Sequence, residues 1–131
     1  MDEVPIRSGD DVVRVRQQVR NAAAENGLSL VDQTKLVTAA SELARNTLVH
    51  GGGGAAQIEV VKSANGRTGV KLHFTDEGPG IADIALALTD GWTSGTGLGL
   101  GLSGARRLVD EFELNSKPGA GTSVMVVKWS R

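Results

Sequence analysis

Cysteine is absent from this sequence of 131 residues. A disulfide framework and thiolate chemistry are therefore excluded, and the composition suits a reducing cytoplasm. An excess of charge of one sign is absent as well, because 14 Lys and Arg residues stand against 15 Asp and Glu residues and no block of like charge occurs. We therefore expect no nucleic-acid partner and no membrane-binding surface.

Long apolar runs are also missing. No stretch approaches the roughly 18 consecutive apolar residues of a membrane-spanning helix, and the N-terminal MDEVPIRSGDD lacks the apolar run of a signal peptide. Hydrophobic residues make up 40% and charged residues 22% of the chain, which is typical of a globular protein. We expect a single cytoplasmic domain over residues 1–131, long enough to bury one sizeable core.

The sequence does contain clear helix and hairpin signals. Apolar residues at helical spacing predict helices over 10–25 and 31–50, and alternating residues around Asn65-Gly66 predict a β-hairpin over 57–76. The remaining predicted elements are a strand over 3–8, a short helix over 82–91, a helix over 98–112 and a second hairpin over 112–129. Because hairpins pair strands antiparallel, we expect an α+β fold, a two-layer sandwich of one mixed, mostly antiparallel sheet with helices on one face.

Five glycines, at positions 95, 97, 99, 101 and 104, gather in the stretch TSGTGLGLGLSG, around the start of a predicted helix. Unpaired N–H groups at a helix N-terminus attract phosphate, and glycine leaves the backbone accessible. The stretch therefore predicts a phosphate cradle, unless it is a flexible surface loop. A Walker-A string is absent, and the Gly-x-Gly-x-x-Gly string at 99–104 lacks the strand–turn–helix setting of a dinucleotide fold.

Further polar positions are candidates for a binding site. Glu42 and Asn46 lie four residues apart, at the edge of the apolar stripe of the longest predicted helix, where a carboxylate needs a partner or a function. Asp76 ends a predicted strand before a glycine-rich turn and is suited to hydrogen-bond a nucleobase, while Thr122 begins the last strand. Each also has an ordinary explanation: an ion pair with Arg45 for Glu42, an Asp-Gly turn for Asp76, and strand propensity for Thr122.

Taken together and in order, four sequence boxes resemble one family. They are SELARNTLVH (41–50), DEGPG (76–80), GTGLGLG (95–101) and GAGT (119–122). The chain resembles the GHKL superfamily, whose Bergerat ATP-binding fold occurs in gyrase, Hsp90, histidine kinases and MutL. Within it, the short length and the segments VDQTKLVTAASELARN, LVDEFELNS and VKW are most similar to the anti-sigma-factor serine kinases, in particular the switch kinases of the bacterial stressosome. The resemblance covers nearly the whole chain.

This resemblance implies a site for ATP and Mg²⁺. It implies that Glu42 activates the attacking hydroxyl, that Asn46 is the ligand of the metal, and that Asp76 and Thr122 hold the adenine. It also implies that Gly78 and Gly80 lie against the base, and that Gly95, Gly97, Gly99 and Gly101 cover the phosphates. The segment 81–94 would form a lid.

The same resemblance implies a protein serine/threonine kinase that phosphorylates a STAS-type antagonist protein in a partner-switching stress pathway and, once released, activates a phosphatase. Two alternatives stay open: an anti-sigma factor that sequesters a sigma subunit, and a stand-alone ATPase that uses water as the acceptor. The sequence departs from many histidine kinases at Val49, where those proteins carry a basic residue. The neighbouring His50 either contacts phosphate or caps the helix.

Overall fold

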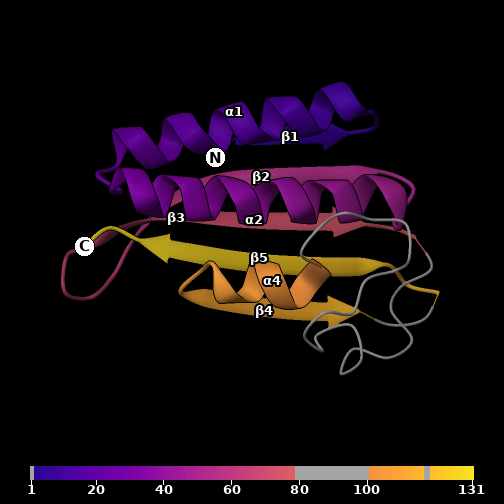
Figure 1. Ribbon diagram of the computed structural model, residues 1–131. Coiled ribbons are helices and arrows are strands. Elements are labelled where there is room, and N and C mark those ends of the chain that lie inside the picture. The colour runs from indigo at the N-terminus through magenta and orange to yellow at the C-terminus, as the bar shows by residue number, and fades with distance from the viewer. Residues whose placement is uncertain (1, 79–100, 117–118) are drawn as a thin grey trace.

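The computed structural model describes residues 2–78, 101–116 and 119–131, which Figure 1 draws in colour. The predicted helix over 82–91 and most of the glycine run lie outside these residues. The described elements, in chain order, are β1 (Asp2–Ile6), α1 (Gly9–Glu25), α2 (Leu30–Val49), β2 (Gly54–Lys62), β3 (Thr68–Asp76), α4 (Gly101–Arg107), β4 (Glu111–Ser116) and β5 (Thr122–Trp129).

The elements form two layers, with the helices on one face of a single sheet (Figure 1). The sheet has five strands in the order β1-β2-β3-β5-β4, and every pairing among the described strands is antiparallel. The predicted α+β sandwich is therefore confirmed, and the parallel component allowed for in a mixed sheet is not found within the described strands. Among the described helices, none is both long and apolar enough to cross a membrane.

The core lies between the helices and one face of the sheet. Alternate residues of β3 and β5 point toward the helices and are buried, namely Leu72, Phe74, Val124 and Val126. The predicted stripes of the two long helices supply the other side, with Val15, Val19 and Ala23 from α1 and Leu36, Ala40 and Leu43 from α2. Helical spacing on one layer and strand alternation on the other thus meet in one core.

The boundaries of α2 follow from its flanking residues. The side chain of Ser29 accepts a hydrogen bond from the Asp32 N–H at 3.1 Å, which caps the first turn. The helix ends at Val49, before the run of four glycines at 51–54, in agreement with the prediction over 31–50. The first predicted hairpin is also confirmed, although β2 begins at Gly54, three residues earlier than expected.

The helix predicted over 98–112 is wrong at its C-terminal end. Within the described residues α4 covers only Gly101–Arg107, and β4 has begun by Glu111. The reason is a change of period: Phe112, Leu114 and Ser116 are half-buried, whereas the alternate Glu111 and Glu113 are exposed. This is strand alternation, and it ends the helical pattern soon after Arg107.

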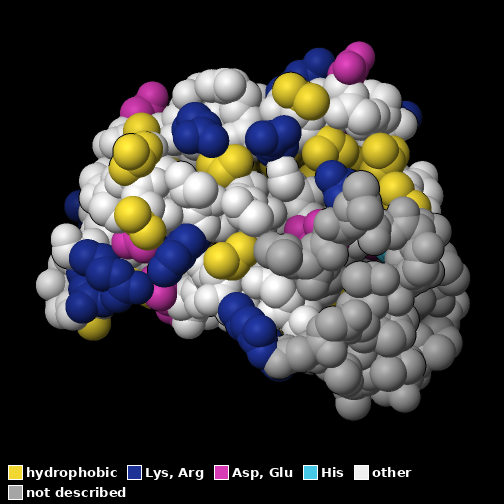
Figure 2. Space-filling view, viewed as in Figure 1, with side chains coloured by type: hydrophobic (Ala, Val, Ile, Leu, Met, Phe, Trp, Pro, Cys, Tyr) yellow, Lys and Arg dark blue, Asp and Glu magenta, His cyan; other side chains and the backbone are white. Residues whose placement is uncertain are grey.

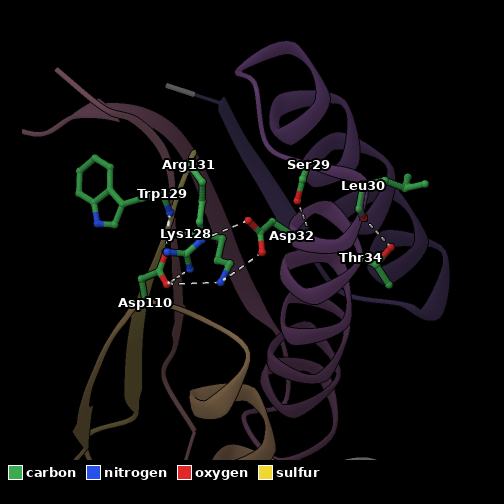
Figure 3. Close-up of polar contacts among 8 residues, drawn as sticks. All are labelled: Ser29, Leu30, Asp32, Thr34, Asp110, Lys128, Trp129 and Arg131. Atoms are coloured by element: carbon green, nitrogen blue, oxygen red, sulfur yellow. Dashed lines mark hydrogen bonds and ion pairs between the residues drawn. The ribbon is translucent and has the colours of Figure 1, made fainter.

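A charged cluster lies between α2 and the sheet near the end of β5 (Figure 3), with Asp32 and Lys128 buried and Asp110 and Arg131 at the surface. Lys128 is 3% exposed, and its Nζ lies 3.6 Å from Asp32 Oδ1 and 3.3 Å from Asp110 Oδ1. Arg131 contacts the same two acids, with Nε 3.5 Å from Asp32 Oδ2 and Nη2 3.1 Å from Asp110 Oδ1. The Trp129 N–H donates to Asp110 Oδ2 at 2.8 Å. These four charged side chains are called the Asp32–Lys128 cluster below.

Acid is expected to weaken the fold through this cluster. Burial alone would raise the pKa of Asp110, but the hydrogen bond from the Trp129 N–H and the charge of Lys128 outweigh it and hold the pKa below its ordinary value of 3.8. A carboxylate whose pKa is lower in the folded state stabilises the protein above its unfolded pKa, and this stabilisation is lost as the pH falls through the folded pKa. We therefore expect the free energy of unfolding to decrease below pH 3.8.

The substitution Asp110→Asn isolates this contribution, because an amide does not titrate. Urea unfolding of the variant and of the unchanged chain over several acidic pH values should show a shallower pH dependence for the variant. Equal slopes for the two proteins would assign the acid sensitivity to other carboxylates.

Candidate functional site

Two of the predicted site residues lie on the second half of α2. Glu42 is 9% exposed and Asn46, one turn later, is half-buried. Both flank the fully buried side of the helix, where Leu43 and Thr47 face the core. A buried carboxylate and a half-buried amide therefore stand one above the other at the border of the core.

The ion pair considered for Glu42 is present. Arg45 Nη1 lies 3.8 Å from Glu42 Oε2, and the Arg45 side chain is 51% exposed. A long pair with an exposed partner contributes little to stability. A catalytic function for Glu42 stays compatible with this geometry.

The predicted adenine residues meet at the opposite side of the site, on the rim of the sheet. Asp76 is the last residue of β3 and stands in register with Gly54 of β2 on one side and Thr122 of β5 on the other. Asp76 Oδ1 accepts a hydrogen bond from the Gly78 N–H at 2.9 Å. One carboxylate oxygen is thus used by the turn, and the side chain as a whole packs against Gly51, which follows α2.

A glycine at that end of α2 makes the close approach possible. A Cβ placed on Gly51 would lie 2.6 Å from Asp76 Oδ2, and one on Gly78 would lie 2.8 Å from the Gly51 carbonyl oxygen. The Gly51 N–H in turn donates to the Asn46 carbonyl at 3.1 Å. The structure therefore joins Asn46, Gly51 and Asp76 in one continuous set of contacts between the helix and the sheet.

Alanine at Gly51 is expected to disturb this contact. The new methyl group would overlap Asp76, and overpacking of this kind costs about 1–3 kcal/mol. Chemical denaturation and nucleotide titration of Gly51→Ala should show lower stability and weaker binding. Gly9→Ala is the matched control, because a Cβ on Gly9 meets nothing within 4 Å. Equal behaviour of the two variants would show that Asp76 is free to shift.

The rim beside Asp76 is hollowed. An open hollow of about 400 Å³ is lined by residues at the ends of three strands and the turn before β5, including Asp76, Leu114, Ser116, Gly121 and Thr122. Ser116 Oγ and Thr122 Oγ1 lie 2.9 Å apart across the β4–β5 pair. The hollow offers a carboxylate and two hydroxyls beside an apolar wall, which suits a flat heterocycle with hydrogen-bonding edges. Glu42 and Asn46 do not line it.

The other predicted glycines are only partly described. Gly80, Gly95, Gly97 and Gly99 lie outside the described residues, and Gly101 is the first residue of α4. His50 is the C-cap residue of α2, where its backbone N–H donates to the Asn46 carbonyl at 2.9 Å.

Asn46 is a described residue of the kind expected to bind a magnesium ion. In the ranges that the structure describes, no group of three or more His, Cys, Asp or Glu side chains could hold a metal. Mg²⁺ bound with a triphosphate typically takes one or two protein oxygens and keeps waters. The half-buried amide oxygen of Asn46, one turn from Glu42, fits that requirement.

Two contributors to the site were missed from the sequence. Gly51 was not among the predicted site residues, although its position directly after the SELARNTLVH box was a usable signal. Ser116, which contacts Thr122, carried no signal, because its partner is set by the pairing of β4 with β5.

The comparison with known families agrees with the predicted family and fold. Residues 31–130 match the family described as histidine kinase-, DNA gyrase B-, and HSP90-like ATPase. This match covers most of the chain, and the protein belongs to that family.

Two curated proteins are similar in sequence to this chain over most of its length. The chain is 47% identical over 121 residues to the serine/threonine-protein kinase RsbT of Bacillus subtilis (strain 168), covering 92% of this chain and 90% of that protein. It is 29% identical over 117 residues to an anti-sigma F factor of Thermoanaerobacter sp. (strain X514), covering 87% of this chain and 82% of that protein.

Solved structures show the same fold. A Mycobacterium tuberculosis protein with RsbU and RsbW domains superposes with a TM-score of 0.64 at 23% identity, over 100% of this chain and 33% of that one. The mycobacterial sensor histidine kinase MprB superposes with a TM-score of 0.59 at 19% identity, over 99% of this chain and 97% of that one.

Proposed function

We propose that this protein is a serine/threonine protein kinase that transfers the γ-phosphoryl group of Mg-ATP to a STAS-type antagonist protein in a bacterial partner-switching stress pathway. The observation that carries the proposal is the contact between the two halves of the site. Gly51 brings the end of the helix that bears Glu42 and Asn46 against the carboxylate of Asp76. The 47% identity to a serine/threonine-protein kinase supports the same conclusion.

Each described residue has a defined task in the proposed reaction. Asp76 and Thr122 hold the adenine at the rim of the sheet, and Gly78 lets the base approach the backbone. Asn46 ligates Mg²⁺, which binds the phosphates and neutralises their charge when present. The remaining proposed contacts to base and phosphates fall on Gly101 and on Gly80, Gly95, Gly97 and Gly99, and these last four lie outside the described residues.

Glu42 is the proposed catalytic residue. The partner's hydroxyl oxygen attacks the γ-phosphorus, a new P–O bond forms, and the bond to the β-phosphate oxygen breaks with ADP as the leaving group. The proton of the hydroxyl passes to the Glu42 carboxylate. Phosphoryl transfer relies mainly on positioning and charge neutralisation, so a carboxylate beside the metal ligand is sufficient for this step.

The proposed biological role is that of a switch. The chain acts as one cytoplasmic domain over residues 1–131, binds its unphosphorylated antagonist, phosphorylates it and is thereby released to activate a phosphatase. We expect neither a nucleic-acid nor a membrane partner. The similarity to an anti-sigma F factor favours a second candidate, in which the released chain sequesters a sigma subunit.

One experiment tests the kinase and another separates the two partners. Incubation with labelled ATP, Mg²⁺ and purified STAS proteins, followed by mapping of the modified residue, should show transfer to a serine or threonine. Label that appears only as free phosphate would favour an ATPase with water as the acceptor. Co-purification of a phosphatase supports the switch, whereas co-purification of a sigma subunit supports the alternative.

A further inference from the structure

The Asp32–Lys128 cluster is not used by the proposed reaction. It is nevertheless one of the most buried polar features among the described residues, with Lys128 3% and Asp32 6% exposed. Figure 3 shows Asp32 on the side of α2 that faces β5, while Leu30 and Thr34 of the same helix point away from it. The cluster therefore ties the beginning of α2 to the end of β5.

The same two elements carry the candidate site at their other ends. From Asp32 to Asn46 the helix rises about 21 Å at 1.5 Å per residue. From Lys128 back to Thr122 the strand covers about 20 Å at 3.3 Å per residue. The two elements run in opposite directions across the same layer boundary (Figure 1), so the cluster lies at one end and the site at the other.

Apolar packing between α2 and the sheet does not by itself require such a cluster. Hydrophobic attraction is non-directional, and a buried ion pair is often replaceable by apolar residues without loss of stability. An ion pair with fixed partners does add something that apolar contacts lack, which is a defined position along the helix axis. Polar groups buried in helical interfaces are best documented as devices that set register.

We propose that Asp32 and Lys128 are positioning residues that fix the axial register of α2 against β5, and so hold Glu42 and Asn46 at the correct distance from Asp76 and Thr122. This inference rests on the proposed kinase function for its effect on turnover. The register itself is a property of the fold and is measurable without any nucleotide.

The register is measured by the distance between spin labels. Because the sequence contains no cysteine, the exposed positions Thr38 of α2 and Glu113 of β4 accept labels uniquely as Thr38→Cys and Glu113→Cys. We expect a narrow distance distribution in the otherwise unchanged chain. We expect a shifted or broadened distance distribution in the double variant Asp32→Leu with Lys128→Met. Both residues are changed together so that neither charge stays buried without its partner.

Two control variants separate an effect on the register of α2 from a general loss of charge or of stability. Arg14→Met is the matched control for loss of a cation, because Arg14 forms an exposed ion pair with Asp11 at 2.8 Å. Val19→Ala is the control for loss of stability, because Val19 is fully buried on α1. Both controls should keep the narrow distribution. An unchanged distribution in the folded double variant would overturn the inference.

Turnover gives the second readout. Since Asp76 and Thr122 belong to the sheet, the double variant should bind ADP without metal within about twofold of the unchanged chain. Transfer should be roughly tenfold slower, because a 1 Å displacement of a catalytic group is enough for such a loss. Normal transfer combined with an altered distribution would also overturn the positioning role. Absence of transfer in the unchanged chain would instead refute the kinase function, and the label distances would still decide the register.

Discussion

Glutamine at position 42 is expected to abolish phosphoryl transfer while ATP still binds. The change keeps the size of the buried side chain, but it removes the negative charge and with it the ability to accept a proton. General-base assistance is worth about 10²–10⁴ in rate, so the Glu42→Gln variant should lose at least two orders of magnitude in turnover. Transfer of label to the partner protein and calorimetric titration with ATP measure the two quantities separately.

The fold should survive this change. The Arg45 partner is largely exposed at 3.8 Å, and pairs of this kind contribute little to stability. Glu25→Gln is the matched control, because it makes the same substitution at an exposed carboxylate at the end of α1. A Glu42→Gln variant that turns over like this control would reject Glu42 as the proton acceptor.

Asparagine at position 76 is expected to weaken ATP binding by roughly ten- to a hundredfold. The amide oxygen would keep the hydrogen bond from the Gly78 N–H, so the amide nitrogen would take the place of Oδ2. A donor would then face the donor amine of adenine, and a buried mismatch of this kind costs about 1–3 kcal/mol. Calorimetric titration of Asp76→Asn with ATP measures the loss.

The control for this second substitution is Asp10→Asn. Asp10 is an exposed carboxylate in the first turn of α1, and its loss should leave ATP affinity unchanged. If Asp76→Asn also binds ATP normally, Asp76 serves only the turn that follows β3, and the adenine is held elsewhere.

The local parts of the fold were predictable because their signals are local. The stripes of Val15 and Val19 in α1 and of Leu36 and Leu43 in α2 repeat at helical spacing, and these residues are buried as expected. Gly66 stands at φ 86° in the turn of the first hairpin, where the Asn-Gly pair indicated it. Each of these signals is contained within a short window of sequence.

The parts that were missed depend on contacts between distant segments. The placement of β5 between β3 and β4 has no local signal, and the contact of Ser116 with Thr122 follows from it. Lys128 of the strand and Asp32 of the helix are far apart along the chain, so their pairing was invisible in the sequence. The four boxes of the candidate site were recognisable as contiguous strings, whereas the contact of Gly51, directly after the first box, with Asp76 of the second required the structure.

The candidate site is divided between two elements, the sheet and α2, which meet at Gly51. The residues proposed for the adenine, Asp76 and Thr122, stand on the sheet, whereas the proposed proton acceptor Glu42 and metal ligand Asn46 stand on α2. Discrimination between adenine and guanine nucleotides should therefore respond to substitutions on the strands, and the speed of the reaction to substitutions on the helix. Substitutions confined to one turn of α2 are therefore expected to slow the transfer while the recognition of adenine by the sheet remains.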